Sequence, residues 1–333
     1  LSPNYIWLEF SQDLTDFIQT LEAMIHDDAV SRLRGLLTDV REKINTFFED
    51  NAEIVYIPAG RSMITLLGTQ LNYIYGLMDD AQKRTMDYCT QNYLERILQL
   101  KPEFSYSPAQ MIQNTLLLTD TKVNRKLLLT ASELMRSVLQ GEYRYVDGEE
   151  RLQIEGDRYV KINFAYSGQQ EVVWILNVIF YYLLQNKKAY FIIEEPESHL
   201  FPNAQKLITE FIILAKNSGR NQIFLTTHSP YILGTINNLL YAGRISRFVH
   251  HRELQEIIPG DRWLMFSEIT AYYIGHGQVS DCTDADFEAI ENEVIDGASE
   301  EINSDFEKMV SLKEKAMGKE EETYAADNGS VTV

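Results

Sequence analysis

The fold is decided by residues 189–197, which read AYFIIEEPE. A run of apolar and aromatic residues without a helical period is typical of a strand buried in a parallel sheet. The run ends in two adjacent carboxylates, Glu194 and Glu195, and Pro196 and Glu197 follow them. Carboxylates beside a buried strand are costly unless they bind a cation or orient water. The alternative is a solvated cluster at a helix start, where the helix dipole favours Glu195 and Glu197.

A second apolar strand follows further along the chain. Residues 222–230 read QIFLTTHSP, and residues 203–217 between the two strands have a helical period. Strand, helix and strand at this spacing form a βαβ unit, so the two strands should be parallel. Ligands of open parallel sheets bind at the carboxyl ends of the strands. We therefore expect Glu194, Glu195 and His228 to share one edge of the sheet.

A helix start lies upstream of both strands. Residues 167–171 read SGQQE and open an apolar helix predicted over residues 169–184. Ser167 is predicted to be the N-cap, and Gly168 leaves room for the close approach of another group to the backbone. A helix N-terminus of this kind can bind phosphate through its free N–H groups. The alternative is an ordinary helix cap without a ligand.

The composition excludes several classes of protein. The 333 residues are 45% hydrophobic and 24% charged, which is typical of a globular chain of about two domains. The 2 cysteines lie far apart and form no Cys-x-x-Cys pair, which predicts a reducing, cytoplasmic compartment. The longest apolar run, residues 172–184, is too short to span a membrane. The net charge of −19 lies largely after residue 280, and it does not steer the chain to DNA.

The coarse pattern of periods and turns divides the chain into six segments. Residues 53–57 predict a short strand that ends at Pro58. Asp147-Gly148 predicts a hairpin turn. We expect a helical segment at 1–50, a core strand and turn at 51–68, a helical insertion at 69–142, a β hairpin or meander at 143–165, the core domain at 166–280, and an acidic helix with a disordered tail at 281–333.

The order of these pieces resembles the nucleotide-binding core of ABC-type P-loop ATPases, in the branch that contains SMC-like and OLD-family proteins. Residues 167–171 look like the signature motif, residues 190–195 look like Walker B with its catalytic glutamate, and residues 196–200 look like the D-loop. His228 looks like the switch histidine. Residues 56–62, which read YIPAGRS, are similar to a segment of related AAA ATPases of bacterial anti-phage defence. The resemblance implies an α/β fold with a mainly parallel sheet, a helical insertion and a small antiparallel β element.

The resemblance also implies ATP and Mg²⁺ as ligands. Glu194 would hold Mg²⁺, as Walker B acids do, and Glu195 would act as the general base that polarises the attacking water. His228 would contact the γ-phosphate and sense its loss.

The signature motif implies a partner. Ser167, Gly168 and Gln169 would bind the γ-phosphate of an ATP held by the other protomer, so two chains would form a homodimer with composite ATP sites. Arg61 would reach the nucleotide or the dimer partner, and the alternative is a surface arginine. A separate effector protein and DNA are further partners of such a switch, with the helical insertion as the contact.

One motif of the family is absent. The chain contains no Gly-x-x-x-x-Gly-Lys-Ser/Thr loop, so we expect Walker A upstream of Leu1 in the natural protein and poor ATP binding by this chain alone. Two other functions stay open. One is a metal-dependent nuclease that uses Glu194, Glu195 and Glu197, and the other is a non-catalytic scaffold that kept the fold.

Overall fold

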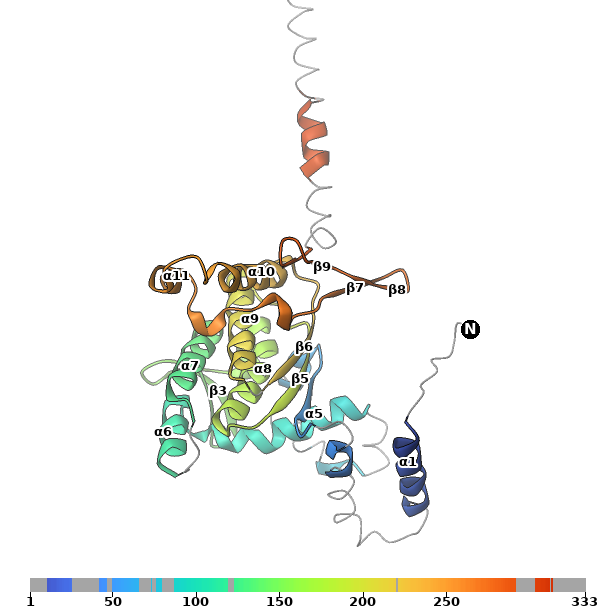
Figure 1. The fold of residues 1–333 in the computed structure, drawn as a ribbon. Helices are drawn as coiled ribbons and strands as arrows, with labels where there is room; N and C mark the ends of the chain where they lie inside the picture. Colours follow the sequence, from blue (N-terminus) through green and yellow to red (C-terminus); the bar gives the residue numbers. More distant parts are fainter. Residues whose placement is uncertain are drawn as a thin grey trace, which may run out of the picture. The chain divides into compact units, whose positions relative to one another are not determined.

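The structure is a computed structural model that describes residues 11–25, 42–46, 50–65, 73, 76–79, 87–118, 123–219, 221–291, 303–311 and 313. The chain divides into two compact units, Leu1–Glu53 and Ile54–Val333. The first unit contains helix α1 (Gln12–Ile25). The second unit contains the core and every predicted site residue, and many of its elements are labelled in Figure 1.

A three-stranded sheet in the order β1-β5-β6 forms the centre of the core. Its strands are β1 (Glu53–Ile57), β5 (Ala189–Glu194) and β6 (Gln222–Thr226). Strands β5 and β6 are parallel, with Glu194 opposite Thr226, and helix α9 (Pro202–Asn217) connects them. The predicted βαβ unit is therefore confirmed. Phe224 of β6 is 50% exposed, so this strand is less buried than β5.

Helices pack on one face of this sheet and form the hydrophobic core. Helix α8 (Ser167–Leu184) is buried nearly all round, which explains why its sequence is apolar on every side. It packs with α7 (Arg125–Leu139) and α9 on one side of the sheet (Figure 1). Alternate residues of the strands complete the core, namely Val55, Ile57, Phe191 and Ile193. This core fixes the positions of the loops at the strand ends.

A small antiparallel sheet is formed by β2 (Glu142–Val146), β3 (Glu149–Glu155) and β4 (Arg158–Lys161). The turn between β2 and β3 consists of Asp147 and Gly148, and both residues have positive φ angles, of 53° and 79°. Two such residues are typical of a type I′ hairpin turn. The short helix η3 (Ile162–Phe164) then leads into α8. The predicted meander is thus present.

The segment before this meander is helical, in the order α5 (Tyr88–Leu100), η2 (Lys101–Ser105), α6 (Pro108–Leu118) and α7. A buried ion pair attaches η2 to the meander, because the Lys101 ammonium lies 2.7 Å from the Glu150 carboxylate. The Tyr143 hydroxyl donates to the same carboxylate over 2.7 Å. Burial, followed by the Glu150 charge, raises the pKa of Tyr143 well above its ordinary value, so this hydroxyl remains a donor.

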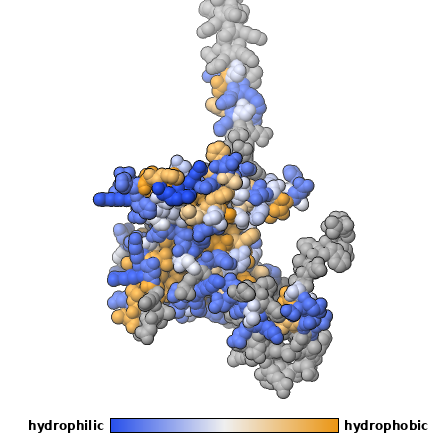
Figure 2. Space-filling model, viewed as in Figure 1, coloured by the Kyte–Doolittle hydropathy of each residue, from blue (hydrophilic) through white to orange (hydrophobic). Residues whose placement is uncertain are grey.

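The C-terminal part of the core continues through α10 (Pro230–Ile245), α11 (His251–Ile257), η4 (Gly260–Arg262) and η5 (Phe266–Glu268). A hairpin of β7 (Tyr272–Gly275) and β8 (Gln278–Asp281) projects from it (Figure 1). Ile274 and Val279 face each other across this hairpin and are 75% and 67% exposed. Figure 2 shows hydrophobic side chains there among hydrophilic ones.

The predicted acidic helix does not begin at residue 281. Residues 283–290 form the short strand pair β9 (Thr283–Asp284) and β10 (Ala289–Ile290) instead. Ile290 is buried, and the Asn237 side chain exchanges two hydrogen bonds of 2.8 Å with its main chain. These contacts outweigh the helical preference that the acidic sequence predicts for these residues. Residues 303–311 are helical, and the predicted disordered tail after residue 319 lies outside the described residues. In the described part of the chain, no helix has the length and apolarity of a membrane span.

Candidate functional site

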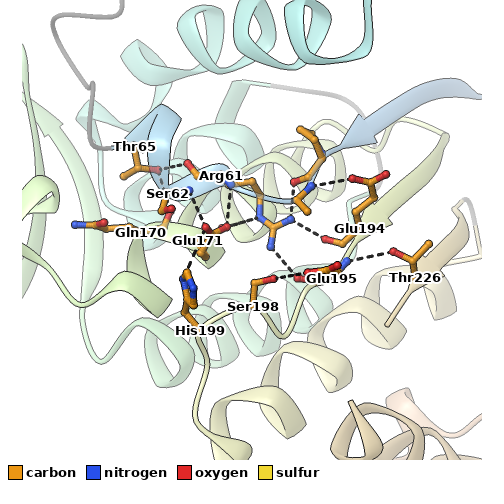
Figure 3. Close-up of polar contacts among 12 residues, drawn as sticks. Arg61, Ser62, Thr65, Gln170, Glu171, Glu194, Glu195, Ser198, His199 and Thr226 are labelled. Carbon is orange, nitrogen blue, oxygen red and sulfur yellow. Dashed lines mark hydrogen bonds and ion pairs between the residues drawn. The ribbon is translucent and has the colours of Figure 1, made fainter. Parts of the chain in front are cut away.

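Glu194 is the last residue of β5, and β1 holds its carboxylate in place. The Tyr56 hydroxyl donates to Oε1 over 2.6 Å, and the Ala59 N–H donates to Oε2 over 3.0 Å. The hydrogen bond to Glu194, then burial and the Glu194 charge, raise the pKa of Tyr56 to about 12. Tyr56 therefore stays protonated at neutral pH and keeps this carboxylate oriented. Figure 3 shows Glu194 at the edge of the site.

Glu195 begins the loop after β5 in an uncommon backbone conformation. Its φ angle is +40°, in the left-handed region that non-glycine residues rarely occupy. Its N–H donates to the Thr226 carbonyl over 3.0 Å, which extends the β5–β6 ladder by one bond. The Ser198 hydroxyl donates to Oε2 over 3.1 Å, while Oε1 lies 3.6 Å from Nε2 of His228. The prediction that Glu195 and His228 share one edge is confirmed.

The side chains of Glu195 and His228 are both accessible to solvent. The Glu195 side chain is 40% exposed and that of His228 is 86% exposed. Both therefore face solvent at the carboxyl ends of the parallel strands. Outlying backbone conformations that survive in folded proteins are concentrated at functional sites. The geometry can present a carboxylate base and an imidazole to a ligand on this edge.

Glu197 is bonded to the loop after β6. Its Oε1 accepts the Thr227 hydroxyl over 2.8 Å and the His228 N–H over 2.7 Å, so it holds the loop after β6. Within the described ranges, no three side chains of His, Cys, Asp or Glu converge to hold a metal ion. The three-carboxylate cluster of the nuclease hypothesis is therefore not formed there, because the turn at Glu195 directs the carboxylates to different partners.

Arg61 lies at the centre of the site and is completely buried. Its Nη1 donates to the carbonyls of Pro58 and Glu194 over 2.6 and 2.7 Å, and its Nη2 donates to that of Glu195 over 2.9 Å. Its Nε donates to the Glu171 carbonyl over 2.9 Å. The surface-arginine alternative is therefore wrong. Figure 3 shows the guanidinium between α8 and the end of β5.

Glu171, in the first turns of α8, is the functional candidate that sequence reasoning missed. Its side chain is 1% exposed, and Oε2 lies 3.4 Å from Nε of Arg61. The N–H groups of Arg61 and Ser62 donate to its two oxygens over 2.9 and 3.0 Å. The available signal was a carboxylate directly before the apolar run of residues 172–176, where a charge needs a buried partner.

The N-terminus of α8 differs from the prediction by one residue. Tyr166 is the N-cap and Ser167 is the first helical residue, and Ser167 is exposed. The Gln169 side chain accepts the Tyr166 N–H over 3.0 Å and donates to the Leu139 carbonyl over 2.6 Å. Gln169 thus fixes the helix start against α7, and its amide is occupied by protein groups.

Gly168 is buried against the loop that follows β5. A Cβ atom at this position would lie 2.6 Å from the His199 carbonyl oxygen and 3.0 Å from Cδ2 of Leu200. The absence of a side chain therefore lets the signature-like turn of α8 contact the D-loop-like segment directly. His199 has a left-handed φ of 60°, and its Nδ1 lies 3.9 Å from Oε1 of Glu171.

The comparison with known families agrees with this arrangement. Residues 18–233 match the model of the family described as AAA ATPase domain, and this range includes β1, α8, β5 and β6. No curated protein matches the chain. Because the matched range covers more than half of the 333 residues, the chain belongs to the AAA ATPase domain family. The α/β core with parallel β5 and β6 is that of a P-loop ATPase.

Proposed function

We propose that this AAA ATPase domain protein hydrolyses ATP as a cytoplasmic homodimer and works as an ATP-driven switch. The observation that carries the proposal is the pair of Glu195 and His228, 3.6 Å apart beside Glu194 at the carboxyl ends of parallel strands. The order of the sequence motifs supports the SMC-like and OLD-like branch, and with it a role in DNA-related or anti-phage processes. A separate effector protein and DNA remain proposed partners of the helical insertion.

Glu194 would hold Mg²⁺ in this proposal. Mg²⁺ usually takes one or two carboxylates together with water and phosphate oxygens, so a three-ligand protein cluster is not required. Each oxygen of Glu194 accepts one hydrogen bond, from Tyr56 or Ala59, and a carboxylate has about four acceptor sites. The carboxylate therefore retains capacity for a cation. Bound Mg²⁺ would neutralise charge on the phosphates.

Glu195 would accept a proton from the attacking water. The Ser198 hydroxyl holds one oxygen of this carboxylate, and the other oxygen faces His228. The side chain is exposed enough to meet a water molecule and is fixed enough to orient it. His228 would contact the γ-phosphate from the neighbouring strand end.

The start of α8 would bind the nucleotide of the partner protomer. The free N–H groups of a helix N-terminus favour anions, and Ser167 adds an exposed hydroxyl beside Gly168. Large aromatic residues next to these turns are left exposed, which supports a protein partner there. They are Phe164, Tyr166 and Phe201, which are 76%, 83% and 84% exposed.

The test is Glu195→Gln in the natural full-length protein. The amide keeps the shape of the side chain but cannot accept the proton, so ATP turnover should fall roughly 10²–10⁴-fold while ATP binding persists and dimers accumulate. Glu253→Gln, at an exposed position of α11, is the matched control and should leave turnover unchanged. Unaltered turnover in the Glu195 variant would remove that residue from the role. Mg²⁺-dependent cleavage of DNA that is lost in this variant would favour the nuclease instead.

A further inference from the structure

One buried arginine joins three segments that are distant in the sequence. Arg61 follows β1, its Nε contacts the first turns of α8, and its Nη atoms contact the main chain at the end of β5. The partners lie 110 residues away in Glu171 and 134 residues away in Glu195. Figure 3 shows that these contacts converge on a single side chain.

The burial of this guanidinium requires compensation, and a carboxylate and four hydrogen bonds supply it. A buried charge is tolerated only when it is paired and its donors are hydrogen-bonded. Here the Glu171 carboxylate provides the counter-charge, and main-chain carbonyls accept from each nitrogen of the guanidinium. Two of those carbonyls belong to Glu194 and Glu195, at the point where the chain leaves the sheet. Arg61 is thus bonded to the backbone that carries the acidic side chains.

We propose that Arg61 is a positioning residue for Glu195 and that Glu171 anchors Arg61 to α8. The inference rests on the proposed function, because Glu195 is a general base only in the proposed hydrolysis of ATP. The left-handed backbone of Glu195 is unfavourable for a residue with a side chain, so contacts must hold it. The Arg61–carbonyl bond supplies one such contact. The Glu195 N–H bond to Thr226 and the Ser198 N–H bond to the Glu195 carbonyl supply two more.

The same pair joins the start of α8 to the catalytic loop. Glu171 accepts the N–H groups of Arg61 and Ser62 through its side chain and accepts Arg61 Nε through its own carbonyl. A displacement of the first turns of α8 would therefore move Arg61 and, through it, the carbonyl of Glu195. A buried guanidinium with every nitrogen engaged is not available for a phosphate, which distinguishes this role from direct nucleotide binding.

The test is Arg61→Lys in the natural full-length protein, with Arg158→Lys as the matched control at a side chain that is 76% exposed. Lysine keeps the charge but cannot donate in the several fixed directions of a guanidinium. We expect kcat to fall roughly 10- to 100-fold, because misplaced catalytic groups lose rate steeply, while KM for ATP stays within about twofold. An unchanged kcat would overturn the inference. A raised KM with unchanged kcat would overturn it in favour of direct nucleotide contact.

A second measurement needs no ATPase activity, so it separates this inference from the proposed function. In the Arg61→Lys variant, amide hydrogen exchange should be faster than in the wild type for residues 195–200, whose amides include those that bond within this loop. Exchange in α9 should be unchanged. Uniform acceleration, or none, would show that Arg61 is only a structural residue. If Arg61→Lys does not fold, Glu171→Gln should give the same local acceleration, and its absence would refute the inference. If the wild-type protein has no ATPase activity and the variant still shows the local acceleration, only the proposed function is refuted.

Discussion

Replacing Gly168 with alanine tests whether the signature-like turn of α8 is packed on the loop after β5. The added methyl would lie 2.6 Å from the His199 carbonyl oxygen, 3.2 Å from its carbon and 3.0 Å from Cδ2 of Leu200. The Leu200 side chain can rotate away. The His199 carbonyl is main chain, and it can retreat only if the loop or the helix moves.

The magnitude follows from two opposing terms. Overpacking of a well-filled contact typically costs about 1–3 kcal/mol. Alanine is favoured over glycine within a helix by up to about 1 kcal/mol, which offsets part of this cost. The expected net destabilisation is about 1–2 kcal/mol. At about 2–4 °C per kcal/mol for domains of this order of size, the Tm should fall by about 2–8 °C.

The assay is thermal unfolding without nucleotide, so that a role of Gly168 in phosphate binding cannot contribute. Gly234→Ala is the matched control, because this position also lies in a helix, α10, and a Cβ there meets nothing within 4 Å. The control should melt at the wild-type Tm or above it. If Gly168→Ala is as stable as this control, the close contact with His199 does not constrain the turn, and the packing argument is refuted.

Two further predictions concern polar side chains that are bonded to a carboxylate. Tyr56 should ionise at about pH 12, because the hydrogen bond to Glu194 holds its proton, so the associated stability is complete below its ordinary pKa of 10.0 and is lost as the pH rises through 12. An absorbance titration of wild type minus Tyr56→Phe that shows ionisation near pH 10 would contradict this. Lys101→Met should destabilise the protein by about 3–5 kcal/mol in urea unfolding, because it leaves the Glu150 carboxylate buried without its cation. Adding Glu150→Leu to this variant should recover part of the lost stability. Equal losses of stability in the single and the double variant would refute the account.

Local patterns were sufficient to predict β5, β6 and their parallel pairing. The apolar run before Glu194, the helix after it and the second run before Thr226 require a parallel pair, because a connection of this length cannot form a tight hairpin. The side chains of Glu195 and His228 then meet at the same edge for purely geometric reasons. Asp147-Gly148 predicted its turn in the same way, since few residue pairs accept two positive φ angles.

Other parts of the site depended on contacts that no local pattern contains. Three acids within four residues suggested a shared metal cluster, but Glu197 follows the left-handed turn at Glu195 and accepts the Thr227 hydroxyl instead. The acidic pattern after residue 281 predicted a helix, but Asn237 and the buried Ile290 form a short strand pair there. In both cases a hydrogen bond from a distant segment outweighed the local preference.

The sequence by itself determined the α/β class, the parallel pair of strands and the edge on which Glu194, Glu195 and His228 lie. Only the tertiary structure decided that Arg61 is buried and that Glu171 is its partner. The physical reason is that secondary structure follows from side-chain period and turn chemistry within a few residues. The position of a buried charge depends on a counter-charge and carbonyls that packing brings from more than a hundred residues away.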